Sequence, residues 1–134
     1  MREIKFRLWD EKFQEMTNDV TLYANGWIAC FFDNKGDVKY HPDSNIVKVM
    51  QYTGLKDKNG KEIYEGDILK ISNPYVGDII SEVVWGGAEY PAFDLPNYDG
   101  DTMNAFSAIQ FNGEDEMEVI GNIYENPELL EGEK

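Results

Sequence analysis

The chain has 134 residues, with 26 acidic and 12 basic side chains and a net charge of −14. A chain of this length is typical of one domain whose core needs no covalent staples. Its single cysteine, Cys30, excludes an internal disulfide framework and indicates a reducing, cytoplasmic environment. Residues 1–7 interleave charged and apolar side chains, so we expect neither a signal peptide nor a membrane span.

The charge is unevenly distributed along the chain. Residues 1–71 hold 11 Lys/Arg against 12 Asp/Glu, whereas residues 72–134 hold Lys134 alone against 14 acids. The second half therefore lacks the basic footprint on which nucleic-acid binding depends. Its acids form either a surface that attracts a basic partner or mimics nucleic acid, or a solvated surface that keeps the protein soluble.

Turn signals are dense in the first part of the chain and helical periodicity is nearly absent, which predicts a β-rich fold. The first predicted strand can bury one face, because Ile4, Phe6 and Leu8 alternate with Lys5, Arg7 and Trp9, which face water or a neighbour. The run 27–32 is apolar on both faces, so we expect it to be a central strand. Gly36 suits a hairpin turn that needs a positive φ. The strands predicted here cover residues 4–9, 20–23, 27–32 and 38–40.

The second part of the chain continues the pattern. A strong hairpin turn is predicted at residues 57–60, where Asp57 can accept from backbone amides across the turn and Gly60 tolerates positive φ. Near the end, Asn126 suits a helix cap, Pro127 the first helical position and Gly132 the helix end. Leu129 and Leu130 are expected to pin this short helix to the sheet. The predicted strands cover residues 46–50, 61–64, 68–71, 79–85, 108–111 and 117–120.

The inventory of reactive groups is thin. His41 lies in an expected loop without a fixed partner, and Cys30 lies in an apolar run where a thiolate would be costly. One Cys and one His far apart are not a zinc site. A calcium-loop alignment places Leu95 and Phe106 where carboxylates are required. We therefore predict no catalytic residue, no metal site and no cofactor, and no phosphate-binding glycine loop is present.

Residues 88–106 show no assignable period and combine prolines, acids and aromatics, which is typical of a partner-facing loop. The candidate partner-facing residues are Tyr90, Phe93, Asp94, Tyr98, Asp99 and Asp101. Aromatic residues are expected either to line a groove on a small barrel or to belong to the core, with Trp85 and Tyr64 favoured as core. This aromatic set comprises Tyr52, Tyr64, Tyr75, Trp85, Tyr90 and Tyr98.

Three segments carry a family resemblance. Residues 51–68, QYTGLKDKNGKEIYEGDI, resemble the signature of the YopX family of phage and prophage proteins, and residues 4–10 and 118–130 match the family as well. The stretches 14–47 and 72–116 match nothing recognisable. The resemblance implies a small β-rich protein of phages or prophages of Gram-positive bacteria, in the cytoplasm of the bacterial host cell. It implies no activity and no site residues.

These observations predict one all-β domain over residues 1–134, with α+β as the alternative. An N-terminal β-hairpin region, 1–45, packs against a small, partly open SH3-like barrel, 46–134, that a short C-terminal helix closes. The expected function is non-enzymatic, through binding to a phage or host protein or through self-association as a homo-oligomer, with no membrane role.

Two alternatives remain open. The first is a nucleic-acid-associated role in phage replication or regulation, either as an acidic DNA mimic or by direct contacts, although direct binding is less favoured. Those contacts would come from Arg2, Lys5, Arg7 and residues 56–61. The second is an enzyme that uses carboxylates near His41.

Overall fold

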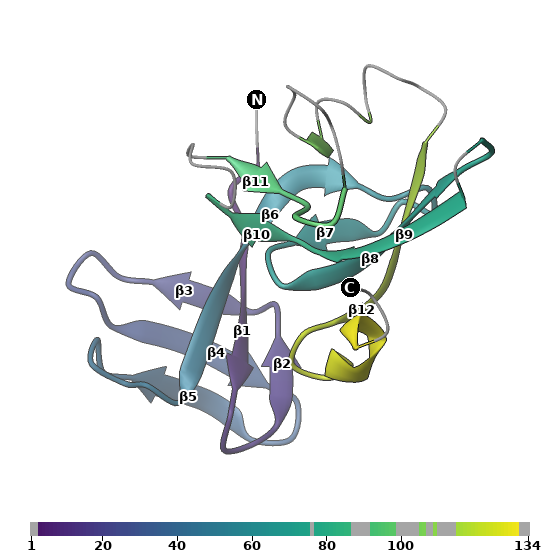
Figure 1. The fold of residues 1–134 in the computed structure, drawn as a ribbon. Helices are drawn as coiled ribbons and strands as arrows, with labels where there is room; N and C mark the ends of the chain where they lie inside the picture. The colour runs from purple at the N-terminus through teal and green to yellow at the C-terminus, as the bar shows by residue number, and fades with distance from the viewer. Residues whose placement is uncertain are drawn as a thin grey trace. The chain divides into compact units, whose positions relative to one another are not determined.

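The structure, a computed structural model, describes residues 3–75, 77–86, 92–98, 105–106, 109 and 115–131 (Figure 1). Nearly all regular structure in these residues is β-strand, which confirms the all-β class. No described helix has the length and apolar character needed to cross a membrane. The chain forms two compact units, Met1–Tyr52 and Thr53–Lys134, and each is described by itself. The expected single domain, divided after residue 45, stays a prediction.

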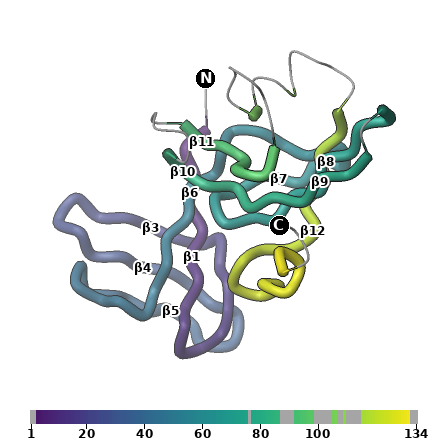
Figure 2. Tube along the Cα trace, in the orientation of Figure 1, coloured from purple at the N-terminus to yellow at the C-terminus, as the bar shows by residue number. Residues whose placement is uncertain are grey.

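The first unit contains two antiparallel sheets. In one, β1 lies between β2 and the first part of β6, and in the other β4 lies between β3 and β5, as expected for the run 27–32. Figure 2 traces β3, β4 and β5 as successive passes of the chain. The strands are β1 (Phe6–Asp10), β2 (Glu15–Thr17), β3 (Val20–Leu22), β4 (Ile28–Phe32), β5 (Gly36–Tyr40) and β6 (Val47–Lys56).

Both sheets of this unit contribute to one core, formed by the buried residues Leu8, Cys30, Phe32 and Tyr40. The expectation that Ile4 begins the buried face of the first strand is wrong, because Ile4 is 71% exposed and β1 begins two residues later. From Arg7 to Asp10 every side chain of β1 is buried, so both faces of this strand are covered. β2 was not predicted, because its three residues are too few to show an alternation of apolar and polar side chains.

A buried carboxylate lies at the end of β1. Asp10 is 1% exposed, and it accepts hydrogen bonds from the Tyr40 hydroxyl and from the backbone N–H of Phe13. A buried carboxylate is tolerated only when such donors replace water. Burial, followed by the hydrogen bond to Asp10, raises the pKa of Tyr40, so its hydroxyl stays protonated and keeps donating.

The second unit is built on a three-stranded antiparallel sheet in which β8 lies between β12 and β9. In Figure 1 this sheet curls, as a partly open barrel requires. The elements are β7 (Glu62–Tyr64), β8 (Asp67–Asn73), β9 (Gly77–Glu82), β10 (Val84–Trp85), β11 (Phe93–Asp94), β12 (Glu116–Asn122) and the 3₁₀-helix η1 (Pro127–Leu130). The core comprises Ile63, Leu69, Ile71, Val83, Leu95, Ala105, Phe106 and Ile109.

The turn between β6 and β7 forms as predicted. Gly60 has a φ of +82°, and Asp57 Oδ1 accepts from the N–H groups of Asn59 and Lys61, each at 2.9 Å. Its other oxygen accepts from Val119 N–H of β12, also at 2.9 Å. Burial alone would raise the pKa of Asp57, but these three donors favour the charged form and hold the pKa below its usual value.

The predicted strand 79–85 is interrupted. Val83 is fully buried and leaves the ladder, since its N–H donates to Asp67 O and its carbonyl accepts from Gly66 N–H. The chain therefore continues as two strands, β9 and β10. Of the predicted strand 108–111 the structure describes Ile109, which is buried and helical.

The predicted C-terminal helix is a single 3₁₀ turn. Pro127 opens it as expected, but Asn126 makes no capping hydrogen bond to it. Instead Asn126 Oδ1 accepts from Asn122 N–H at 3.2 Å, next to an irregularity in β12 before Gly121. Leu129 and Leu130 are half-buried. The predicted end, Gly132, lies outside the described residues.

Candidate functional site

Three of the six residues predicted to face a partner fall within the structure. Tyr90, Asp99 and Asp101 lie outside the described residues. Phe93 and Asp94 form β11, and Phe93 packs against the core of the second unit. Tyr98 is partly buried against the same core.

The polar members of this set bind the chain itself. Asp94 is 9% exposed, and its Oδ1 accepts from the N–H groups of Leu95, at 2.9 Å, and Ala105, at 3.1 Å. The Tyr98 hydroxyl donates to Asp115 at 2.6 Å. These contacts hold neighbouring backbone and side chains in place, and a role of Asp94 and Tyr98 toward a partner stays a prediction.

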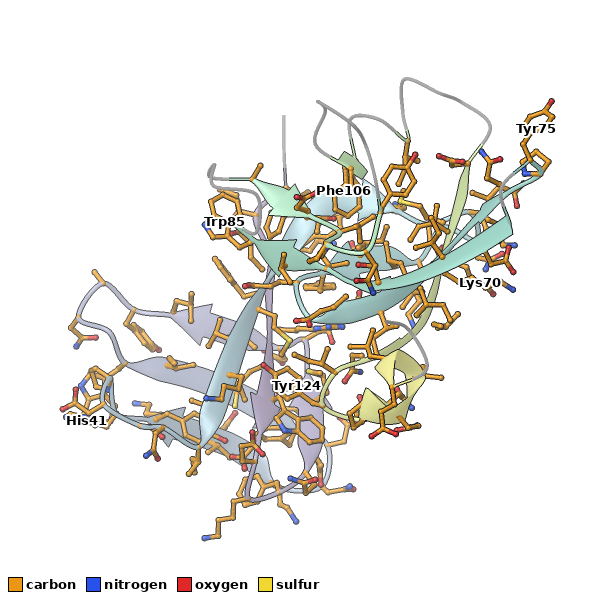
Figure 3. All side chains as sticks on the ribbon, viewed as in Figure 1. His41, Lys70, Tyr75, Trp85, Phe106 and Tyr124 are labelled. Atoms are coloured by element: carbon orange, nitrogen blue, oxygen red, sulfur yellow. The ribbon has the colours of Figure 1, made fainter. Side chains whose placement is uncertain are left out.

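The predicted aromatic set divides between core and surface. Tyr52 and Tyr64 are buried, whereas Trp85 is 51% and Tyr75 is 77% exposed. Tyr64 is therefore a core residue as predicted, but the placement of Trp85 in the core is wrong. Its ring meets Phe93 edge to face, with centroids 4.9 Å apart. Figure 3 shows Tyr75 at the tip of the β8–β9 hairpin and Trp85 on β10.

The two reactive side chains are not arranged for catalysis. Burial raises the pKa of the Cys30 thiol, the charges of Asp10 and Asp19 add to this, and a hydrogen bond with Tyr40 opposes it. His41 is exposed, and its Nδ1 accepts from the N–H of Asp43 at 3.1 Å. Within the described ranges, no group of three His, Cys, Asp or Glu side chains could hold a metal ion.

Large aromatic side chains gather instead on the outward face of the β3–β4–β5 sheet. Cys30 and Phe32 point into the core, so the alternate residues of β4 and its preceding turn point outward. These are Trp27, 39% exposed, and Phe31, 40% exposed, while Tyr23 beside Trp27 is 49% exposed. We call this surface the aromatic face and define it by Tyr23, Trp27, Phe31, Lys39 and His41.

The cross-strand register places these residues in rows. Ile28 pairs with Tyr40, so the next pair outward joins Trp27 to His41, whose rings meet edge to face at 5.1 Å. On the other side, Tyr23 N–H donates to Trp27 O at 2.9 Å. One end of the sheet therefore carries a row of three adjacent rings, and Figure 3 shows His41 at this end.

A hollow of about 450 Å³ lies at the same end, lined by Tyr23, Asn25, Trp27 and Lys39. Two hydrogen bonds stabilise the turn that lines it: Gly26 N–H donates to Tyr23 O, and Trp27 N–H donates to Asn25 Oδ1 at 3.1 Å. A side chain at Gly26 would meet the Pro42 ring at 3.0 Å. The hollow is thus present before any ligand binds, which lowers the entropic cost of binding.

Sequence reasoning missed this face. The run 27–32 is apolar on both faces and predicted a central strand, but nothing in an apolar run distinguishes a covered aromatic ring from an exposed one. The available signal was local: Tyr23 and Trp27 flank an Asn-Gly turn, and such turns lie at the surface.

The family model described as YopX protein matches residues 5–131. The chain belongs to the YopX family. This YopX-family chain is similar to a crystallised protein from Enterococcus faecalis, with 31% identity, a TM-score of 0.67 and coverage of 98% of this chain and 100% of that one. It also shares its fold with the yopX protein of Bacillus subtilis, with 24% identity, a TM-score of 0.62 and the same coverage. No curated protein matches the chain.

The YopX-like motifs serve the fold. In the central motif, Thr53 Oγ donates to Ile63 O at 2.7 Å, and Asp67 Oδ2 accepts from Tyr64 N–H at 2.7 Å. In the C-terminal motif, a side chain at Gly121 would come within 2.6 Å of Asn126 Oδ1. The aromatic face lies between residues 14 and 47, outside all three motifs.

Proposed function

We propose that this YopX-family chain is a phage or prophage accessory protein that acts by binding a protein partner through the aromatic face. The observation that carries the proposal is the exposure of Tyr23, Trp27 and Phe31 on one side of a sheet whose other side is the core. Exposed apolar clusters rimmed by polar groups mark interaction sites more often than isolated exposed residues do. Trp and Tyr are also the residues that contribute most to protein interfaces.

Two features favour a protein partner over a nucleic acid. The net charge of −14 repels a polyanion at long range. Of the basic residues considered for nucleic-acid contacts, Arg7 is 7% exposed, so its guanidinium is withdrawn from solvent. A protein segment can carry a positive or a neutral charge, so the net negative charge need not repel it, and its binding does not depend on Arg7.

The proposal is tested with purified full chain and bacterial lysate, comparing the wild type with Trp27→Ala, Phe31→Ala and the control Trp85→Ala. Trp85 is at least as exposed as the other two but lies in the second unit, so it controls for loss of an exposed aromatic ring. We expect a protein that the wild type and the Trp85 variant retain and the other two variants lose, and that rebinds after purification. Circular dichroism verifies that each variant is folded.

The same samples report self-association. A mass that rises with concentration, and that Trp27→Ala returns to the monomer value, would identify the partner as a second copy of the chain. A monomeric mass at every concentration, together with no protein whose retention depends on Trp27, would reject the proposal.

A further inference from the structure

The two ends of the aromatic face differ in charge. We call the end at Trp27 the donor end. Its hollow is lined by Tyr23, Asn25, Trp27 and Lys39, although the backbone of Lys39 pairs with Ala29, in the middle row of the sheet. Asp43 lies just beyond the hollow, with Oδ2 3.7 Å from His41 Nδ1. At the acid end lie Asp19 and Asp37, on either side of Phe31: Asp37 pairs with Phe31 across β5, and Asp19 O accepts from Phe31 N–H at 3.1 Å. Both acids are exposed.

Most of the polar groups that line the hollow can donate hydrogen bonds. The ammonium of Lys39 and the indole N–H of Trp27 can only donate. Asn25 Oδ1 already accepts from Trp27 N–H, so its side-chain NH₂ is the group left for a ligand. Among the described residues that line the hollow, none carries a carboxylate. This set suits an anionic, acceptor-rich group attached to an apolar body that packs on the rings.

Three exposed charged residues at the face, Lys39, Asp19 and Asp37, form no ion pair with another described residue. Lys70 and Asp78, by contrast, pair elsewhere at 3.6 Å. The positive charge of Lys39 and the negative charges of Asp19 and Asp37 can therefore pair with opposite charges of a ligand.

The spacing of the face matches an extended peptide. Trp27, Ala29 and Phe31 point outward in succession, and at about 3.3 Å per residue the first and last are about 13 Å apart. Ala29 is small, so a gap separates the two large rings. In an extended ligand, residues i, i+2 and i+4 also point the same way and cover the same distance.

We propose that the aromatic face binds an extended segment of a partner protein with an acidic residue at i, an apolar residue at i+2 and a basic residue at i+4, in either chain direction. This inference rests on the proposed function and names the ligand chemistry. The acid enters the hollow, which Lys39 lines from its position opposite Ala29. The apolar residue covers Ala29 between the rings, and the base meets Asp19 and Asp37. A single strand of nucleic acid is disfavoured, because its successive phosphates would reach the acid end.

The test uses the full chain and labelled nonapeptides of equal length, with fluorescence anisotropy as the readout. The central five residues are Glu-Ser-Phe-Ser-Lys, Glu-Ser-Phe-Ser-Glu or Lys-Ser-Phe-Ser-Lys. We expect the first peptide to bind about three- to tenfold more tightly than the other two, because each of the others replaces one exposed ion pair with two like charges. Trp27→Ala removes binding of all three, and Trp85→Ala leaves it unchanged.

A charge-reversal variant, Lys39→Glu, tests whether Lys39 determines which of the three peptides binds most tightly. Lys39→Glu turns the whole face acidic, so the preference should move to the peptide with two lysines. Lys39 is exposed, so this substitution leaves the fold intact even if Trp27→Ala does not.

Three outcomes of the binding experiments would overturn the inference. Equal binding of the three peptides, lost in Trp27→Ala, would reject the charge pattern while supporting the proposed function. Absence of binding by all three peptides up to millimolar concentration would reject the ligand, and the lysate experiment would then judge the proposed function separately. Tighter, Trp27-dependent binding of a thymidine oligonucleotide would show that the face recognises nucleic acid instead.

Discussion

Asp57 offers the sharpest test of how this fold is held together. Its two oxygens accept three backbone N–H groups, two in the β6–β7 turn and one in β12. Hydrogen bonds to a charged group contribute about 1.5–3 kcal/mol each when buried, and less where water can replace the acceptor. The two turn amides lie near solvent, so we assign them about 1 kcal/mol each and the strand amide about 1–2 kcal/mol. Asp57→Ala should therefore lower the free energy of unfolding by about 3–4 kcal/mol.

The measurement is urea denaturation followed by circular dichroism, with the slope of the transition unchanged. Asp57→Asn keeps one oxygen for the turn but offers NH₂ toward Val119 N–H, so about half the loss is expected. Asp78→Ala is the control, because Asp78 makes an exposed ion pair and should matter by less than about 0.5 kcal/mol. A loss below about 1 kcal/mol in Asp57→Ala would refute the reasoning.

The pH dependence follows from the lowered pKa of Asp57. A carboxylate whose pKa is lower in the folded than in the unfolded state stabilises the fold above its unfolded value of about 3.9, and this contribution is lost as the pH falls through the folded value. The stability gap between wild type and Asp57→Asn should thus narrow as the pH is lowered from about 6 toward about 3. A gap that stays constant over this range would show that the charge of Asp57 contributes nothing.

Three further predictions concern other residues. Gly121→Ala should lower the free energy of unfolding by about 1–3 kcal/mol, because the new methyl group displaces the Asn126 side chain. Urea titration measures this loss, and the double variant with Asn126→Ala should recover part of it. Tyr40→Phe should cost about 2–3 kcal/mol, since the buried Asp10 loses a donor, and a loss below about 0.5 kcal/mol would contradict that account. Cys30 should resist alkylation by iodoacetamide at about pH 8 in the folded protein, because it is buried and its pKa is raised, and it should react in urea. Mass spectrometry measures the labelling, and rapid labelling of the folded protein would contradict this account.

The sequence predicted the structural features that depend on adjacent residues, and it missed those that depend on residues elsewhere in the chain. The turn at residues 57–60 was predictable down to the acceptor role of Asp57, because an Asx side chain and a glycine determine it within four residues. The break at Val83 was not, because it depends on hydrogen bonds to Asp67 and Gly66, which lie on another part of the chain.

The candidate site was harder to predict for a similar reason. Asp94 reads as a solvent-facing acid, yet it is buried and accepts from the amide of Ala105, eleven residues away. Trp27 and Phe31 belong to a run that is apolar on both faces, and no local pattern shows that one of these faces stays exposed. Which face of a strand is buried depends on how the sheets assemble, so the alternation of residues along a single strand does not predict it.

The position of β12 in the sheet has a consequence for synthesis on the ribosome. β8 needs β12 as its neighbour, but β12 starts at Glu116, 43 residues after the end of β8 at Asn73. At about 5–20 residues per second, a nascent β8 waits roughly 2–9 s with one row of amides and carbonyls unpaired. Such a row is a template for pairing with other nascent chains. Fast translation of residues 74–122 shortens this interval, and a chaperone that covers the unpaired edge of β8 protects it until β12 arrives.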